Sequence, residues 1–182
     1  MTLSLKKEAG NDNVDYGWIR VDIPEDITKQ CIEFGKEIPE EELYIEEDND
    51  KDWGFGREVE SHITVKYGLH TKDEEEVKSV LEGQKGGEVE LSNIGIFEND
   101  DYDVVKVDIK SPDLHRLNKQ ISDNLEATDS HPTYHPHITI AYVKPGEGKK
   151  YKGSDKLSGK KFSFDKVVFE DSDDNPTTIQ LD

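Results

Sequence analysis

The chain has 182 residues, of which 32% are hydrophobic and 36% are charged, and its formal net charge at pH 7 is −19. Proteins that hold polymeric DNA or RNA present basic surfaces to the phosphates, so this charge balance argues against that class. No apolar run approaches the ~20 residues that a membrane span needs, and the N-terminus carries no signal-peptide pattern. With the lone Cys31 unable to form an internal disulfide, a cytoplasmic location is expected.

The hydrophobic patterning predicts a single α+β domain over residues 1–182, with a loosely ordered end at 1–15. Its strands are expected to be mainly antiparallel. The expected elements in chain order are a strand over 16–23, a helix opened by Pro24 and ended by Gly35, a short strand over 43–45, a strand over 61–67, a turn over 68–70, a helix over 73–81, strands over 89–97 and 104–109, a helix from Pro112, a strand over 135–142, a Gly/Lys-rich loop over 146–159, and strands over 162–169 and 177–181.

One short pattern occurs twice in this order, as His62-Ile-Thr-Val65 and His137-Ile-Thr-Ile140, 75 positions apart. Alternate side chains of a strand point to opposite faces. The histidine and threonine of each copy therefore share one face, while the β-branched residues point into a core. Beyond these tetrads, little of the two halves of the chain is expected to match.

Two histidines and two threonines at one spot suit the cleavage of a phosphodiester. The unperturbed pKa of histidine lies near 6.5, so one ring can accept a proton while the other donates one. Threonine hydroxyls can donate hydrogen bonds to phosphate oxygens, where charge accumulates in the transition state. Such a site requires neither a cofactor nor a metal.

The paired tetrads resemble the signature of the two-histidine phosphoesterases, a superfamily that includes 2′-5′ RNA ligase-like proteins and cyclic phosphodiesterases. The resemblance implies two α+β lobes with outer helices around a central groove, and it makes His62, Thr64, His137 and Thr139 the catalytic set. Which histidine is the acid and which is the base stays open.

One branch of this superfamily is a closer likeness. The stretches Ile38–Tyr44, His62–His70 and Val167–Asp174 are similar to phage anti-CBASS phosphodiesterases, which destroy the cyclic oligonucleotide signals of bacterial immunity. The likeness implies a substrate contact from a carboxylate near the last strands, and Glu170 stands in the matching stretch. The expected substrate is therefore a small cyclic nucleotide, with the host cytoplasm as the location if the chain is phage-encoded.

Three further residues are candidates for substrate binding. Trp53, in a Gly-flanked loop before the first tetrad, and Tyr134, just before the second, can stack on a base, although packing is an alternative for each. Lys66 continues the face of His62 and Thr64 and can meet phosphate, although it can equally be a surface lysine.

Two other interpretations compete with this one. His131, His135 and His137 have the spacing His-x3-His-x-His, which zinc can use, but no acidic or cysteine partner is fixed by spacing and the Pro-rich loop opposes it. A substrate at RNA ends, either a 2′-5′ linkage or a 2′,3′-cyclic phosphate, is the alternative within the same class. A non-enzymatic acidic protein that binds nucleotides or mimics DNA is the alternative from another class.

Overall fold

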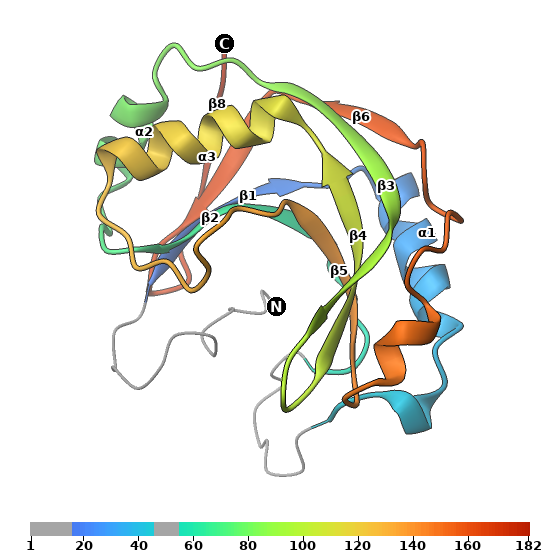
Figure 1. Ribbon diagram of the computed structural model, residues 1–182. Helices are drawn as coiled ribbons and strands as arrows, with labels where there is room; N and C mark the ends of the chain where they lie inside the picture. Colours follow the sequence, from blue (N-terminus) through green and yellow to red (C-terminus); the bar gives the residue numbers. More distant parts are fainter. Residues whose placement is uncertain (1–15, 46–54) are drawn as a thin grey trace.

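A computed structural model, which describes residues 16–45 and 55–182, contains an eight-stranded sheet in the order β6-β3-β4-β5-β2-β1-β7-β8. Every neighbouring pair of these strands is antiparallel, and the sheet curls into an open half-barrel (Figure 1), which confirms the predicted α+β class. The strands are β1 Gly17–Asp22, β2 His62–Leu69, β3 Gly87–Glu98, β4 Asp103–Lys110, β5 His137–Val143, β6 Lys161–Phe164, β7 Lys166–Glu170 and β8 Pro176–Gln180.

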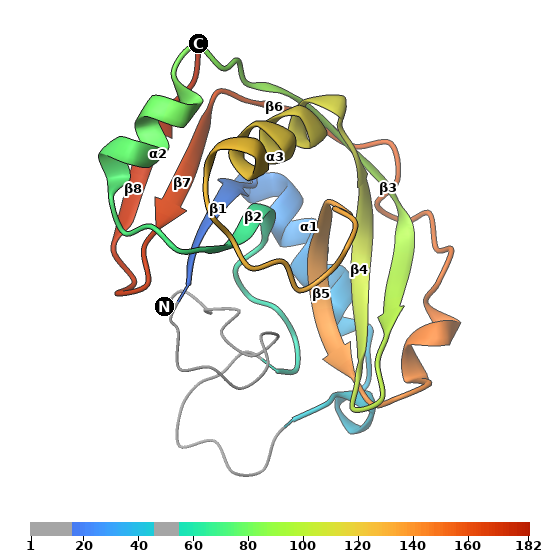
Figure 2. The ribbon, with the colours of Figure 1, turned by 60° about the vertical axis from the view of Figure 1, so that its left-hand side comes forward.

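The strand order has an internal symmetry. It reads the same from both ends when β1 is exchanged with β4, β2 with β5, β3 with β7 and β6 with β8. The two halves meet where β2 lies beside β5 (Figure 2). Ile63 and Ile138 are the residues that pair there. Both isoleucines are fully buried, so the tetrad strands form the centre of the sheet.

The two long helices also occupy equivalent positions, and each of them packs on a strand of the other half of the sheet. Helix α1 (Glu25–Lys36) follows β1 and packs on β5, whereas α3 (Pro112–Asn124) follows β4 and packs on β2 and β3. Helix α2 (Glu74–Leu81) packs on α3, and two short 3-10 helices, η1 and η2, cover Glu40–Glu42 and Glu147–Lys150. None of the helices in the described ranges is long and apolar enough to cross a membrane.

The expected apolar sides of the two long helices are confirmed. Ile27, Cys31 and Phe34 of α1 are buried, as are the apolar residues that α3 turns toward the sheet. Burial raises the pKa of the Cys31 thiol to about 11, so this side chain is a neutral core residue. Helix α1 begins directly after Pro24, as predicted, and the side chain of Asp73, expected within the second helix, caps α2 by accepting from the Glu75 N–H. Gly35 lies inside the last turn of α1, close to Ile140, rather than ending the helix.

The prediction of one strand over 162–169 is wrong. The chain forms β6, which pairs with β3, and then β7, which pairs with β1 on the other half of the sheet, with Asp165 between them. Alternation identifies extended backbone but does not identify the neighbour with which it pairs. The curl of the sheet brings its two halves close enough for this direct connection.

Two local predictions near the tetrads are also wrong. Leu43 makes only an isolated bridge to Val143 after η1, so residues 43–45 are not a strand. Residues Gly68 and Leu69 continue β2 rather than turning the chain. Gly68 has a φ of +84°, and its amide carbonyl accepts a hydrogen bond from the Thr128 N–H, so the glycine marks a close approach of two backbones.

Replacing Gly68 with alanine is expected to destabilise the fold by about 2–5 kcal/mol, from the left-handed φ and from overpacking. A Cβ at this position would lie 2.1 Å from the carbonyl oxygen of Thr128. Gly83 has a φ of +73° with nothing within 4 Å, so Gly83→Ala is the matched control, with an expected cost of about 1–2 kcal/mol. Urea denaturation of both variants measures the difference, and equal losses would show that the contact with Thr128 is unimportant.

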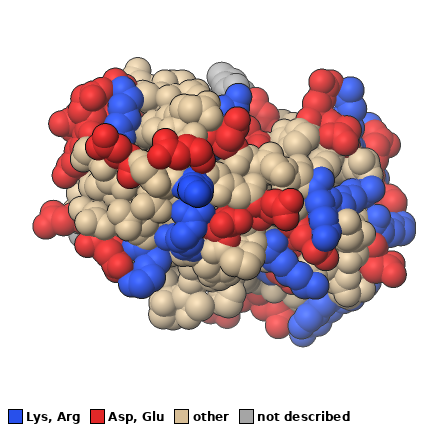
Figure 3. Space-filling view, turned by 90° about the horizontal axis from the view of Figure 1, so that it is seen from above, with Lys and Arg blue, Asp and Glu red and all other residues tan. Residues whose placement is uncertain are grey.

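Many acidic side chains of the surface have a basic side chain beside them. On the face seen in Figure 3, acidic and basic side chains are interspersed. The basic loop over 146–159 follows this pattern, since Lys149, Lys150 and Lys156 pair with glutamates of β3, η1 and the residue after α1. These ion pairs hold the loop against the outside of the sheet.

Candidate active site

The two tetrads lie side by side at the centre of the sheet. Continuing the register of Ile63 with Ile138 by one residue in each direction places His62 opposite Thr139 and Thr64 opposite His137. All four side chains are partly exposed and line one groove of about 630 Å³, a volume typical of ligand sites. The structure therefore brings together the four residues predicted to be catalytic.

The backbone sets the orientation of both imidazole rings. The Nδ1 atom of His62 lies 3.3 Å from the carbonyl oxygen of Glu60, and the Nδ1 atom of His137 lies 2.7 Å from that of His135. A carbonyl oxygen only accepts hydrogen bonds, so Nδ1 carries the proton in each ring. The Nε2 atom of the neutral ring is then left as the proton acceptor.

Both rings favour the neutral form. The pKa of His62 is lowered to about 4, mainly by burial, and the nearby Arg20 guanidinium and His137 act in the same direction. Burial likewise lowers the pKa of His137 to about 4, and Lys106 acts in the same direction. A phosphate anion between the rings has the opposite effect, since it stabilises an imidazolium. Both rings can therefore act as bases, and an anionic substrate can convert one of them into an acid.

These pKa values predict a pH dependence of stability. An unfolded histidine titrates near 6.5, so between pH 6.5 and 4 the unfolded chain binds protons that folded His62 and His137 do not. The free energy of unfolding is therefore highest above pH 6.5 and falls as the pH is lowered toward 4. By pH 5 the loss is roughly 1–2 kcal/mol per histidine. Urea denaturation at pH 7.5 and 5.0 should show a smaller loss for the His62→Gln/His137→Gln variant than for the wild type; equal losses would contradict the lowered pKa values.

A bulge at the last residue of each tetrad extends the repeat. The register shifts at Val65 in β2 and at Ile140 in β5, two equivalent residues that are skipped in the pairing with β1 and β4. Each bulge re-aims the next residues, and the tyrosine five positions after each histidine, Tyr67 or Tyr142, lines the groove. The repeat is therefore His-Ile-Thr-x-x-Tyr, which was missed because strict alternation excludes the sixth position.

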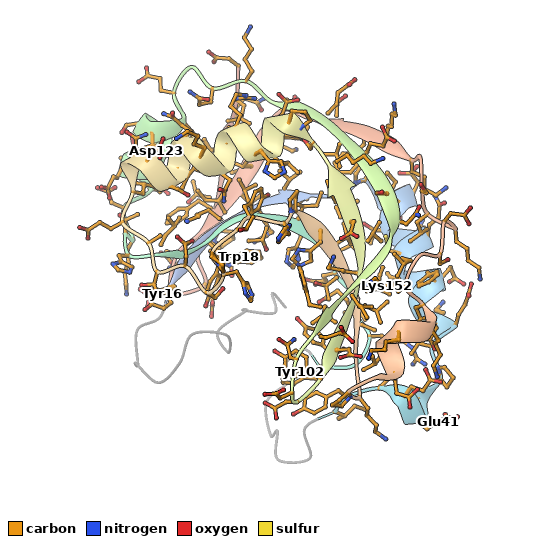
Figure 4. All side chains as sticks on the ribbon, in the orientation of Figure 1. Tyr16, Trp18, Glu41, Tyr102, Asp123 and Lys152 are labelled. Carbon is orange, nitrogen blue, oxygen red and sulfur yellow. The ribbon has the colours of Figure 1, made fainter. Side chains whose placement is uncertain are left out.

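The groove has two arms that diverge from the histidines along β2 and β5. Figure 4 places Tyr102 at the β3–β4 turn, away from Trp18 on β1. The β2 arm is the more polar and includes Lys66, Tyr67, Asn118, Ser122, Asp129 and Tyr134; the β5 arm is the more aromatic and includes Phe55, Glu58, Phe97, Tyr102 and Tyr142. In the β5 arm, Phe55, Tyr102 and Tyr142 have ring centroids 5.2–5.5 Å apart, so each ring supports the others.

The predicted substrate-binding residues differ in where they lie. Tyr134 lines the β2 arm, and its hydroxyl donates to the Thr64 carbonyl oxygen at 2.9 Å. Lys66 also lines this arm, and its ammonium is 2.5 Å from the Asp129 carboxylate. Glu170 is fully buried and pairs with Arg20 at 2.9 Å, outside the set that lines the groove. Trp53 lies outside the described residues.

The spacing His131-x3-His135-x-His137 does not form a cluster of metal ligands. Within residues 16–45 and 55–182, no group of three or more His, Cys, Asp or Glu side chains is arranged to hold a metal ion. Instead, His131 is stacked near Phe97, with 6.3 Å between ring centroids, and His137 meets the same phenylalanine edge-on at 5.0 Å. Of the three, His131 and His137 thus share an aromatic neighbour.

The arrangement suits cleavage in which one histidine takes a proton and the other gives one. In a ribonucleotide, the base deprotonates the 2′-OH, whose oxygen attacks phosphorus, while the acid protonates the leaving 5′-oxygen. The products are a 2′,3′-cyclic phosphate and a free 5′-OH. Thr64 and Thr139 flank the same point and can donate to the non-bridging oxygens as charge develops.

Comparisons with known proteins agree with this geometry. The family model of the 2′-5′ RNA ligase superfamily matches residues 45–175. No curated protein sequence matches the chain. The chain belongs to the 2′-5′ RNA ligase superfamily, that is, to the two-histidine phosphoesterases, and its class of activity is that of a phosphoesterase.

Solved structures show the same fold. The crystal structure of E. coli LigT complexed with 3′-AMP is 19% identical, covers 92% of this chain and 95% of its own, and has a TM-score of 0.58. A structure described as a phosphoesterase is 17% identical, with coverages of 93% and 96% and a TM-score of 0.56. E. coli LigT complexed with phosphate is 16% identical, with coverages of 92% and 94% and a TM-score of 0.55. At these identities the likeness concerns the fold alone.

Proposed function

We propose that this protein is a metal-independent phosphodiesterase that cleaves 3′–5′ bonds of small cyclic oligonucleotide signals. The observation that carries the proposal is the groove that both tyrosines line: because β2 and β5 are antiparallel around Ile63 and Ile138, Tyr67 and Tyr142 lie on opposite sides of the histidine–threonine patch. Stacking on an aromatic side chain contributes about 1–3 kcal/mol per base. A substrate with a base on each side of the scissile phosphate can use both arms, whereas a mononucleotide fills one.

The charge of the protein supports a small substrate. With a net charge of −19 and acidic and basic groups interspersed on the face in Figure 3, long-range attraction of a nucleic-acid polymer is weak. The resemblance to anti-CBASS enzymes suggests that such cleavage would remove an immune signal, in the cytoplasm of a bacterial host.

A second candidate is an enzyme that acts on RNA ends, on a 2′-5′ linkage or a 2′,3′-cyclic phosphate. The matching family is described as the 2′-5′ RNA ligase superfamily, and one similar structure holds 3′-AMP. Such a substrate needs the histidine–threonine patch and one arm. The candidate from another class is an acidic protein that binds a nucleotide without changing it.

Incubation with a 3′–5′ cyclic dinucleotide in excess EDTA separates these candidates. Turnover that survives chelation supports the proposal, and loss of all turnover on chelation would contradict metal independence. Preference for 2′-5′ diadenylate or for RNA with a 2′,3′-cyclic phosphate end would favour the second candidate. Recovery of intact ligand after binding would favour the non-enzymatic protein.

The 2′-deoxy form of the same cyclic dinucleotide is the matched control substrate. It lacks the attacking hydroxyl but keeps both bases and both phosphates, so it should bind and remain uncleaved. Cleavage of the deoxy form would overturn 2′-OH attack while leaving phosphodiesterase activity intact.

A further inference from the structure

A second repeated pattern flanks the tetrads. Arg20-Val-Asp-Ile23, at the end of β1, and Lys106-Val-Asp-Ile109, in β4, lie at equivalent strands of the two halves. In both, the cation stands opposite the threonine of the tetrad and the aspartate opposite the histidine. The expectation that little beyond the tetrads matches is therefore wrong, and each histidine has a cation and a carboxylate on the adjoining strand.

In the first half, an aromatic ring joins the cation to the histidine. The Arg20 guanidinium carbon lies 4.9 Å from the centroid of the Trp18 ring, and that ring meets His62 edge-on at 5.0 Å. The Arg20 Nε donates to the Asp22 carboxylate at 2.9 Å. Trp18 is 2% exposed, so the contacts of its ring with Arg20 and His62 lie away from bulk water, where electrostatic effects are stronger, whereas the Asp22 side chain is 58% exposed.

The second half repeats this arrangement with different residues. The Lys106 ammonium lies 4.3 Å from the centroid of the Phe97 ring, and Phe97 meets His137 edge-on at 5.0 Å. Lys106 also pairs with Asp108. A Cβ at Gly95 would lie 2.4 Å from the Asp108 carboxylate and 2.8 Å from the ammonium, so a larger residue here would require these two side chains to shift.

One difference between the halves concerns Glu170. Glu170 stands opposite Trp18 in the pairing of β7 with β1. The equivalent position in the other half is that of Phe97, which stands opposite Val104 in the pairing of β3 with β4. The Glu170 carboxylate accepts from Arg20 Nη1 at 2.9 Å, so Arg20 is bound to two carboxylates and Lys106 to one. Glu170 therefore acts on the site through Arg20.

We propose that Arg20 and Lys106 are positioning residues that make proton uptake by His62 and His137 depend on a bound phosphate. This proposal rests on the proposed function of the same groove. A cation beside an imidazole opposes its protonation, and a phosphate anion in the groove reverses that opposition. The pinned cations thus hold both rings ready as bases until the substrate itself stabilises one imidazolium.

The charged neighbours of each ring come from several elements. His62 faces Arg20 and Asp22 of β1 and His137 of β5, with Glu170 of β7 behind Arg20. The neighbours of His137 are Lys106 and Asp108 of β4 and His131 of the loop before β5. In both sets the cation and the aspartate act on the ring with opposite signs, and this opposition makes the proposal testable.

NMR titration of the two histidines in the full chain is the test. In Lys106→Met the pKa of His137 should rise by about one pH unit, and in Asp108→Asn it should fall, while that of His62 changes little. Arg20→Met and Asp22→Asn should do the same to His62 and spare His137. Adding inorganic phosphate to the wild type should raise the pKa of at least one ring.

Lys66→Met is the matched control, since Lys66 is a buried lysine of the groove that pairs with Asp129 rather than with a histidine neighbour. In this variant the titration curves of His62 and His137 should match those of the wild type. Shifts of the same sign in Lys106→Met and Asp108→Asn, or none in either, would overturn the proposal, because a merely structural role does not produce opposite signs. These titrations need no turnover, so opposite shifts in a protein that cleaves nothing would refute the proposed function alone.

Discussion

Replacing His62 or His137 with alanine is expected to lower kcat for phosphodiester cleavage by about 10²–10⁴-fold, the usual contribution of a positioned acid or base. Both rings line the same groove, and in each a backbone carbonyl oxygen contacts Nδ1 and leaves Nε2 for the reaction. Removing either leaves the reaction without its base or without its acid. Because the two act as a unit, the double variant should lose little more activity than the worse single variant.

The matched control is His70→Ala. His70 follows β2, stacks on Tyr16 with 5.5 Å between centroids, and lies outside the groove lining. It should keep near-normal activity in the same assay. A His62 or His137 variant with a near-normal rate would remove that histidine from the mechanism.

The elements that the sequence predicted well are those in which one periodic face is buried. Leu114, Leu117 and Ile121 of α3 are all fully buried, and each tetrad places its isoleucine in the core. Burial of one face determines which side chains turn inward, whatever the rest of the sheet does. The face of each strand that carries the histidine and the threonine was therefore predictable from alternation.

Strand partners and bulges were not readable in this way. Asp165 separates two strands that pair with different neighbours. The bulges at Val65 and Ile140 are visible only once β1 is paired with β2 and β4 with β5. Both depend on contacts distant in sequence. Tyr67 and Tyr142 were missed for this reason, although the repeated tyrosine five residues after each histidine was a visible signal.

The role of the cations beside the histidines could not be predicted from the sequence for a different reason. Arg20 and Lys106 belong to strands that carry no tetrad, and their relation to the histidines follows from register. The short repeats Arg-Val-Asp-Ile and Lys-Val-Asp-Ile were visible, but their meaning required knowing that β1 pairs with β2 and β4 with β5. A charged residue in a strand is ordinarily a surface residue, and only the pairing makes it a neighbour of the site.

Thr64→Val and Thr139→Val are each expected to lower kcat by about 10²–10³-fold, in the range seen when a single transition-state donor is removed. Valine keeps the β-branched shape and the strand preference of threonine, so the loss should appear in catalysis rather than in folding. Serine is the matched control, since Thr64→Ser and Thr139→Ser keep the hydroxyl and should retain most activity. Equal losses for valine and serine would point to packing rather than hydrogen bonding.

The register also predicts which threonine works with which histidine. Thr139 stands opposite His62 and Thr64 opposite His137 across the β2–β5 pairing, although each threonine is closer in sequence to the other histidine. In double-mutant cycles, His62→Ala with Thr139→Val should therefore be further from additivity than His62→Ala with Thr64→Val. Stronger coupling within a tetrad than between the strands would mean that each strand presents its own half of the site. Stronger coupling between the strands than within a tetrad would show that each histidine works with the threonine of the other strand. Both copies of the tetrad are then needed to build either half of the site.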